Sequence, residues 1–229
     1  ANKRTAEAAL LCAGAHAEMA AQIARGELDT ALCITRPPGH HAGGPSGFFS
    51  GGCFINNVAV AAAAARATGA VQRILILDWD VHHGDGTQEI FYDDADTLTV
   101  SIHRFEHEPG GFYPSAGLPA HTGHGRATGC NVNVALPFEE GGYGDADYLA
   151  IFEHLVLPVA RAFGPELVLV AAGFDSARGD PLGGFDLTPA GYAAMLARLR
   201  ELPGLGGRGL LLSLEGGYSA TATPDGLEA

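Results

Sequence analysis

The chain has 229 residues, 47% of them apolar, and a formal net charge of −13 at pH 7 with neutral histidines. This length suits one α/β domain or two small ones, and the negative charge argues against direct binding of nucleic acid through its phosphates. No apolar run approaches the ~18 residues of a membrane span, so we expect no membrane segment.

Helices and strands are predicted to alternate along the chain. We expect helices over residues 5–25, 55–68, 85–92, 145–163 and 188–203, and strands over 30–35, 73–77, 97–102, 131–136, 168–171 and 209–214. A long irregular loop over 104–130 interrupts the pattern, and loops of this length are usually functional or disordered. The alternation predicts a single domain over 1–229 with an α/β fold, in which helices cover both faces of a mainly parallel sheet.

Two helices carry further local signals. Thr188 followed by Pro189 is a favourable helix start, an N-cap residue before a proline in the first turn. The helix over 145–163 has apolar side chains at helical spacing, which predicts a buried stripe of Leu149, Phe152, Leu155, Val156 and Val159. His16, inside the first helix, is expected to be solvated or capped.

The stretch LDWDVHHGDG over residues 77–86 is the centre of the pattern. It follows an apolar run that is typical of a buried parallel strand. Ionisable side chains at such a strand end are costly unless they are paired or hold a metal ion. Asp80 and His82 are two residues apart, so their side chains point the same way on an extended chain, with Asp78 one step deeper. This geometry lets Asp80 and His82 bind one ion.

Reactive side chains also end three other predicted strands. A rigid loop with two prolines presents His40 and His41, Asp175 ends a later strand, and Tyr218 follows the last one. In an open parallel sheet the ligand crevice lies beyond the carboxyl ends of the strands. We therefore expect these side chains to converge on the residues of the central stretch.

The converging groups suit metal-assisted hydrolysis of an amide. Asp80, His82 and Asp175 offer two oxygens and one nitrogen, which suits Zn²⁺ with an open fourth position, although Fe²⁺ is also tolerated. The histidine pair can supply a general base. Its tautomers would be set by nearby carboxylates, and a tyrosine could donate a hydrogen bond to the developing oxyanion.

Four strings in the sequence, RPPGHHA, DWDVHHGDGTQEIFY, AGFDSARGDPLGG and LEGGY, resemble the histone deacetylase family, and most of all its class II branch. The resemblance runs from about residue 31 to residue 218. It implies the arginase-like, three-layer α/β/α fold, truncated here at both ends. It also implies zinc-dependent hydrolysis of acetyl-lysine in proteins, with a metal-bound water attacking and a histidine as general base.

The resemblance assigns roles to individual residues. The metal ligands correspond to Asp80, His82 and Asp175; the general base to His41 and its electrostatic partner to His40; the carboxylates behind them to Asp78 and Asp85; and the carbonyl-polarising tyrosine to Tyr218. A structural K⁺ site corresponds to Ser101 and the backbone around Asp78, Asp80, His82 and Ile102. Gly51 and Tyr113 are expected to contact substrate in the channel.

The sequence departs from the family pattern in the channel. The segment after His41 is about two residues longer than usual, and Gly52 stands where a second channel aromatic is expected. Either Phe48 or Phe49 replaces that aromatic, or the channel wall is open there. Leu182, on the expected rim, leaves the entrance apolar where polyamine-selective relatives carry glutamate.

Two other functions stay open. The first is an acetylpolyamine or other small-amide deacetylase with the same fold. The second is a catalytically weak acetyl-lysine-binding or corepressor scaffold, which would not need to hydrolyse an amide. We expect an acetylated protein or peptide as substrate, possible corepressor partners, and no direct contact with nucleic acid or membrane. The four cysteines, without CxxC spacing, and the absence of a signal peptide predict an intracellular setting, in the nucleus or cytoplasm.

Overall fold

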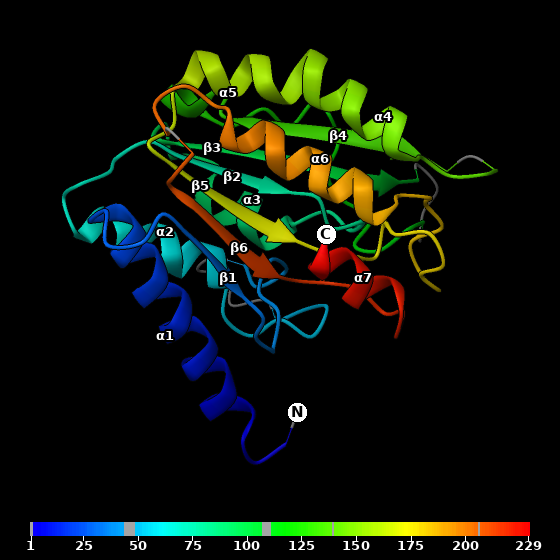
Figure 1. The fold of residues 1–229 in the computed structure, drawn as a ribbon, viewed down its shortest axis with the longest axis horizontal. Helices are drawn as coiled ribbons and strands as arrows, with labels where there is room; N and C mark the ends of the chain where they lie inside the picture. Colours follow the sequence, from blue (N-terminus) through cyan, green and yellow to red (C-terminus); the bar gives the residue numbers. More distant parts are fainter. Residues whose placement is uncertain (1, 44–48, 107–110, 139, 206) are drawn as a thin grey trace.

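The computed structural model describes residues 2–43, 49–106, 111–138, 140–205 and 207–229. Its centre is a six-stranded sheet with the order β1-β6-β5-β2-β3-β4, in which all neighbouring strands are parallel (Figure 1). The strands are β1 (Thr30–Cys33), β2 (Ile74–Asp78), β3 (Thr97–Phe105), β4 (Asn131–Pro137), β5 (Leu167–Ala172) and β6 (Leu210–Leu214). The predicted parallel sheet is confirmed.

Helices precede, connect and follow these strands. They are α1 (Thr5–Ala24), α2 (Asn57–Ala67), α3 (Asp85–Phe91), α4 (Asp145–Ile151), α5 (Leu157–Phe163), α6 (Pro189–Arg200) and α7 (Ala222–Glu228). A 3₁₀ turn, η1 (Gly125–Ala127), lies in the long loop, and a π-helical segment, η2 (Phe152–Val156), joins α4 to α5. The three-layer α/β/α arrangement is confirmed, since helices lie on both sides of the sheet (Figure 1).

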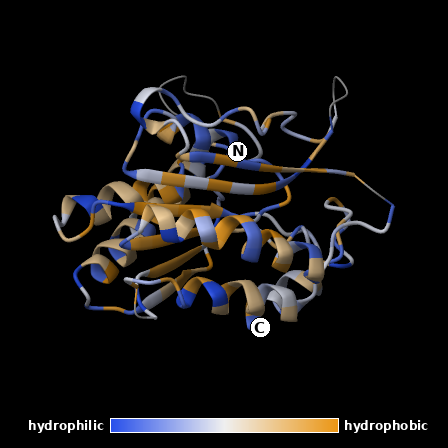
Figure 2. Ribbon diagram, turned by 90° about the horizontal axis from the view of Figure 1, so that it is seen from above, coloured by the Kyte–Doolittle hydropathy of each residue, from blue (hydrophilic) through white to orange (hydrophobic). Residues whose placement is uncertain are grey.

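Side chains alternate along the buried strands and so feed two separate apolar cores. In β2, Leu75 and Leu77 pack in a cluster with α4, α5 and α6, whereas Ile74 and Ile76 pack with α1 and α2. Figure 2 shows strands rich in hydrophobic residues in the interior and helices that carry both hydrophobic and hydrophilic residues. This double coverage is what an all-parallel sheet requires.

The chain changes direction across the sheet at β2. After β2 it proceeds outward on one side through β3 and β4, and then returns to form β5 on the other side of β2. The carboxyl ends of β2 and β5 therefore flank a topological switch point. Open α/β sheets bind their ligands at such points.

The start of α6 agrees with its sequence signal. Thr188 is the N-cap of α6, and its hydroxyl accepts a hydrogen bond from the Gly191 amide at 3.3 Å. This contact satisfies one of the free N–H groups of the first turn. The strand β3 runs three residues beyond the predicted end, and α7 was not predicted.

The predicted stripe on the helix over 145–163 is modified by the π-helical segment. Phe152 and Val156 are fully buried, and Tyr148 and Leu157, which the predicted stripe left out, are also buried. Leu155 is not part of the apolar cluster. A regular helical spacing therefore gave only part of the correct face.

His16 is fully buried, so the expectation of a solvated residue is wrong. Its Nδ1 lies 2.8 Å from the Cys12 carbonyl oxygen and its Nε2 lies 2.9 Å from Ser213 Oγ. Burial lowers the pKa of the His16 imidazole. The ring therefore joins α1 to β6 as a neutral hydrogen-bonding group.

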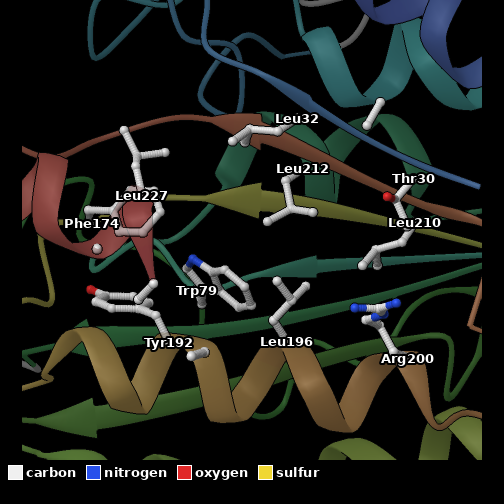
Figure 3. Close-up of a pocket in the computed structure, with 14 residues that line it drawn as sticks. Thr30, Leu32, Trp79, Phe174, Tyr192, Leu196, Arg200, Leu210, Leu212 and Leu227 are labelled. Atoms are coloured by element: carbon white, nitrogen blue, oxygen red, sulfur yellow. The ribbon is translucent and has the colours of Figure 1, made fainter.

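A cavity of about 270 Å³ lies between α6, α7 and the β1–β6 side of the sheet (Figure 3). Trp79, Phe174 and Tyr192 line one end of it, and leucines line much of the rest. Trp79 follows Asp78 directly, so strand alternation turns its ring to the opposite face of the sheet from the Asp78 carboxylate. Among the described helices, none is long and apolar enough to cross a membrane.

Candidate metal centre

Three ionisable side chains meet beyond the carboxyl ends of β2 and β5. Asp80 and His82 follow β2, and Asp175 follows the neighbouring strand β5. Their ligand atoms all lie within 4.8 Å of one another, and all three residues are buried. His82 Nδ1 lies 2.9 Å from Asp80 Oδ1 and 3.1 Å from Asp175 Oδ2. The structure thus brings together the residues predicted as metal ligands.

Main-chain N–H groups fix the two carboxylates of this cluster. Asp175 Oδ1 accepts a hydrogen bond from the Val81 amide at 2.8 Å. Asp80 Oδ1 accepts one from the His82 amide at 2.8 Å, and Asp80 Oδ2 accepts one from the Gly216 amide at 2.7 Å. The turn after β6 is therefore tied directly to the residues that follow β2.

The electrostatics of the cluster favour a cation. Burial opposes ionisation of Asp80, but the charge of His40 and the hydrogen bonds of His82 outweigh it, so the pKa of Asp80 lies well below its usual range. Burial and the charge of Asp80 raise the pKa of Asp175 to about 7. Burial opposes protonation of His82, but the two carboxylates raise its pKa to about 9. Two buried carboxylates beside one imidazole form a donor set that fits Zn²⁺.

Two glycines let the backbone approach these carboxylates closely. A Cβ atom at Gly173 would lie 2.3 Å from Asp80 Oδ2, and one at Gly216 would lie 2.2 Å from Asp175 Oδ2. Any larger residue would therefore displace a predicted ligand. The glycine two residues before the aspartate in AGFD and the glycine two residues before the tyrosine in LEGGY were a signal that the sequence analysis did not use.

The histidine pair lies beside the cluster, with each ring held by a carboxylate. His40 Nδ1 lies 2.9 Å from Asp78 Oδ2, and His41 Nδ1 lies 2.7 Å from Asp85 Oδ1. Burial opposes protonation of His40, but Asp80 and Asp78 raise its pKa well above the usual value. Burial and the charge of His40 lower the pKa of His41 to about 4. The surroundings of the two imidazoles thus act in opposite directions, favouring the charged form of His40 and the neutral form of His41.

Glu215 holds the loop that presents the histidine pair, and the sequence analysis missed it. Its Oε2 accepts hydrogen bonds from the Gly39 amide at 2.7 Å and the His40 amide at 3.1 Å. The Arg36 guanidinium donates to the Glu215 carbonyl oxygen at 2.5 Å. Glu215 is fully buried, and burial raises the pKa of its carboxyl to about 7. A buried acid that directly follows the last strand was the available signal.

Aromatic rings form the walls around the cluster. The Phe112 ring stacks on His82, with centroids 4.9 Å apart, and the Tyr113 ring meets His41 edge-on at 4.9 Å. The Tyr113 hydroxyl hydrogen-bonds Ser50. Tyr113 was predicted to contact substrate in the channel, whereas Phe112 was given no role in the site. Both rings in fact contact site histidines.

Gly51 and Gly52, at the departure expected in the channel, differ in what surrounds them. A Cβ at Gly51 would lie 2.2 Å from His41 Cδ2, whereas a Cβ at Gly52 would meet nothing within 4 Å. Phe49 is 70% exposed and contacts Phe54, with ring centroids 6.0 Å apart. Phe48 lies outside the described residues. The structure brings no wall side chain to Gly52 from the part of the chain it describes.

Leu182, which was predicted on the rim, and Tyr218 are both about half exposed, and we call this exposed side of the cluster the entrance. Tyr218 is 48% exposed, and its ring meets His82 edge-on with centroids 6.3 Å apart. Burial of the hydroxyl, with the charges of Asp80 and Asp175, raises the pKa of Tyr218 to above its usual range. The phenol therefore keeps its proton and can donate a hydrogen bond. Leu182 is 50% exposed.

The residues predicted for a K⁺ site lie on adjacent strands. Asp78 of β2 is the register partner of Ser101 of β3, and Ile102 follows it, fully buried. The Ser101 hydroxyl lies 2.9 Å from His103 Nδ1, and Asp78 Oδ1 accepts a hydrogen bond from the Asp80 amide at 3.1 Å. The residues are neighbours, and their binding of K⁺ stays a prediction.

The fold and this arrangement match one family. The family profile described as Histone deacetylase domain matches residues 1–229. The chain belongs to the histone deacetylase family. The crystal structure of the HDA15 HD domain superposes with a TM-score of 0.92 at 46% identity, covering 100% of this chain and 62% of that chain.

Curated histone deacetylases are also close in sequence. Histone deacetylase 15 of Arabidopsis thaliana is 49% identical over 228 residues, which are 97% of this chain and 40% of that protein. Histone deacetylase clr3 of Schizosaccharomyces pombe is 43% identical over 222 residues, or 95% of this chain and 31% of that protein. The chain thus spans less than half the length of these relatives. The predicted family and its class II character are confirmed.

Proposed function

We propose that this protein is a zinc-dependent lysine deacetylase, with residues 1–229 forming part or all of a single catalytic domain. The observation that carries the proposal is the buried cluster of Asp80, His82 and Asp175, whose ligand atoms lie within 4.8 Å of one another beside two histidines. A divalent cation held there would act as a Lewis acid on the amide carbonyl and on the attacking water. Zn²⁺ fits this donor set best, and Fe²⁺ remains compatible with it.

The histidine pair would provide the general acid–base catalysis of the reaction. An ionised carboxylate only accepts hydrogen bonds, so the 2.7 Å contact with Asp85 places the proton of His41 on Nδ1. This leaves Nε2 of His41 as the free base. His40, held by Asp78 and buried beside the cluster, would serve as an electrostatic partner. Protonated His41 would then return its proton to the leaving lysine amine.

Tyr218 would donate its hydroxyl hydrogen to the acetyl oxygen as negative charge develops. Its ring lies against His82, and the phenol is partly open to the entrance, where a substrate carbonyl would arrive. Donors of this kind contribute most when they are already oriented before reaction. The phenol would thus complement the cation on the same oxygen.

Substitution of Tyr218 tests this function in the intact, zinc-loaded protein. We expect Tyr218→Phe to lower kcat on an acetyl-lysine peptide by roughly 100-fold, the usual effect of losing an oxyanion donor, with zinc content unchanged. Tyr92→Phe, outside the site, is the matched control. Unchanged turnover in Tyr218→Phe would show that the proposed role of Tyr218 is wrong. Zinc binding without any amide hydrolysis by the wild type would support the acetyl-lysine-binding scaffold instead.

The apolar entrance favours a peptidyl substrate over an acetylpolyamine. Leu182 presents no carboxylate to a second ammonium group, and it is half exposed at the entrance. We therefore propose acetyl-lysine in a protein or peptide as the substrate, with corepressor proteins as partners. Comparison of kcat/KM for an acetyl-lysine peptide and acetylspermidine decides between these substrate classes.

We also propose a structural K⁺ bound by a group of residues on β2, β3 and the turn after β2, namely Asp78, Asp80, His82, Ser101 and Ile102. A rise in thermal stability with KCl but not with an equal concentration of tetramethylammonium chloride would support the K⁺ site.

All four cysteines are free thiols, three of them buried, which supports a reducing compartment such as the nucleus or cytoplasm.

A further inference from the structure

The carboxylate of Asp180 joins two turns at the entrance of the site. Asp180 is only 9% exposed and lies in the loop that follows Asp175. Its Oδ1 accepts hydrogen bonds from the Leu182 amide at 2.8 Å and the Gly183 amide at 3.2 Å. Its Oδ2 accepts one from the Tyr218 amide at 2.7 Å. One side chain therefore binds the rim loop and the turn after β6.

Tyr218 depends on this contact for its position. The bond to Asp180 is the one hydrogen bond that Tyr218 makes to the described part of the chain. The preceding residue, Gly217, has φ of +131°, a conformation that a side chain would strain, and its Cβ position lies 2.7 Å from Thr223 Oγ1. The backbone conformation of the turn before Tyr218 is thus restricted, and the Asp180 carboxylate fixes the position of the Tyr218 main chain.

Charge pairing does not explain the burial of Asp180. The nearby Arg178 is engaged by Asp186, with Nε 2.7 Å from Asp186 Oδ1, and no described cation forms an ion pair with Asp180. The three main-chain N–H groups are its partners instead. Both carboxylate oxygens are needed at once, because each faces a different turn. An asparagine offers one acceptor oxygen and would turn N–H donors toward the other turn.

The packing around the rim loop makes the arrangement rigid. A Cβ at Gly183 would lie 1.8 Å from the Asp175 carbonyl oxygen, so the loop doubles back tightly on the residue predicted as a metal ligand. The Arg104 guanidinium also donates to the Gly183 carbonyl oxygen at 3.2 Å. Asp180 therefore connects Tyr218 to a loop that is itself fixed.

We propose that Asp180 is a positioning residue for the reaction, which holds the Tyr218 phenol and the Leu182 rim in one geometry. The inference rests on the proposed role of Tyr218 as the donor to the acetyl oxygen. Asp180 does not touch substrate. It acts through the Tyr218 main chain, so its loss should matter only as far as Tyr218 matters.

A double-mutant cycle in the intact, zinc-loaded protein tests this coupling. The variants are Asp180→Asn, Tyr218→Phe and both together, with Asp186→Asn as the control from the same loop. We expect Asp180→Asn to lower kcat on an acetyl-lysine peptide about tenfold with zinc content unchanged, as for loss of a charged hydrogen-bond acceptor. The double variant should be no slower than Tyr218→Phe alone, because the donor is already gone.

A second substrate adds a readout that general loosening of the fold would not give. A trifluoroacetyl amide is more electrophilic and depends less on a hydrogen-bond donor, so Asp180→Asn should lose less rate on trifluoroacetyl-lysine than on acetyl-lysine. Equal losses on both substrates, or additive losses in the cycle, would overturn the inference. Should Asp180→Asn fail to fold, Asp180→Glu, which keeps the charge but displaces the acceptor, is read in the same cycle.

The same cycle separates the two proposals. If Tyr218→Phe keeps wild-type turnover, the proposed role of Tyr218 is wrong and the coupling has no basis. If Tyr218→Phe loses activity while Asp180→Asn keeps it, the proposed function stands and the positioning role of Asp180 is wrong.

Discussion

The floor and the entrance of this site are built in different ways. On the floor, Asp80, His82 and Asp175 are buried, and each carboxylate is held by main-chain N–H groups from another segment. At the entrance, Leu182 and Tyr218 are about half exposed and are held through a single carboxylate.

This difference indicates where each region can tolerate change. The floor is fixed by two adjacent parallel strands and by glycines that leave no room for a Cβ, so a substitution there should disturb binding of the proposed metal ion. The entrance consists of turns after the strands, where side chains reach solvent. Substitution of a rim residue such as Leu182, which takes no part in the proposed chemistry, should alter the choice of substrate more than the ability to hydrolyse it.

The largest effect is expected on the floor. Asp80→Ala removes one of the two buried carboxylates and leaves Asp175 and His82 without the partner that completes the cluster. We expect zinc stoichiometry to fall below half and kcat on an acetyl-lysine peptide to fall by more than about 1,000-fold. Metal analysis and turnover measure both, with Asp93→Ala at the exposed surface as control. Full zinc occupancy in Asp80→Ala would show that the cluster is not the metal site.

A matched pair of glycines tests the boundary between floor and entrance. Gly51 and Gly52 both have positive φ, +57° and +78°, so alanine strains the backbone at either position. Only at Gly51 would the new Cβ meet the His41 ring, at 2.2 Å. We expect Gly51→Ala to lower kcat by about 100-fold, as misplacement of a catalytic group does, and Gly52→Ala by far less. Equal losses would mean that backbone strain alone is responsible.

The buried hydrogen bonds of His16 should contribute measurably to the free energy of unfolding. His16→Leu removes two buried hydrogen bonds and should lower the free energy of unfolding at pH 7 by about 2 kcal/mol. The folded-state pKa of His16 is lowered, so the unfolded chain binds more protons below about pH 6.5 and the wild type loses stability as the pH falls.

Denaturant unfolding between pH 7 and pH 5 measures this dependence. The His16→Leu variant should lose less stability over that range than the wild type, because it no longer carries the imidazole. His124→Leu, whose ring is exposed, should follow the wild type. Parallel pH curves for wild type and His16→Leu would contradict the buried neutral imidazole.

The smallest effect is expected at the entrance. Leu182→Glu places a carboxylate at a half-exposed position, and an exposed ion pair is worth up to about 1 kcal/mol. The ratio of kcat/KM for acetylspermidine over acetyl-lysine peptide should therefore rise about fivefold. Leu182→Gln is the uncharged control. A rise of the same size in the glutamine variant would remove charge as the cause.

The sequence was sufficient for the features that depend on chain periodicity. Apolar strands followed by Asp80 and Asp175 predicted a parallel sheet with ionisable groups at one edge, and that sheet is present. The helix start at Thr188 and Pro189 was also recognisable, because capping is local. Such features need only neighbours along the chain.

Other features depend on contacts between distant segments and were missed for that reason. Glu215 could not be linked to the Gly39 and His40 amides without knowing that β6 ends beside that loop. The role of Asp180 likewise depends on its hydrogen bond with the amide of Tyr218, which lies in a distant turn. The π-helical segment over Phe152–Val156 broke the regular spacing on which the predicted stripe relied.

The position of β1 has a consequence for how the protein is made. Thr30 pairs with Leu210, and among the described strands β6 is the one that β1 contacts. During synthesis, β1 therefore leaves the ribosome long before its partner exists and must wait with an unpaired edge. Such delayed, non-local pairing is slow and prone to association with other chains. Since Glu215 follows β6, the histidine loop reaches its final geometry only when that late segment arrives.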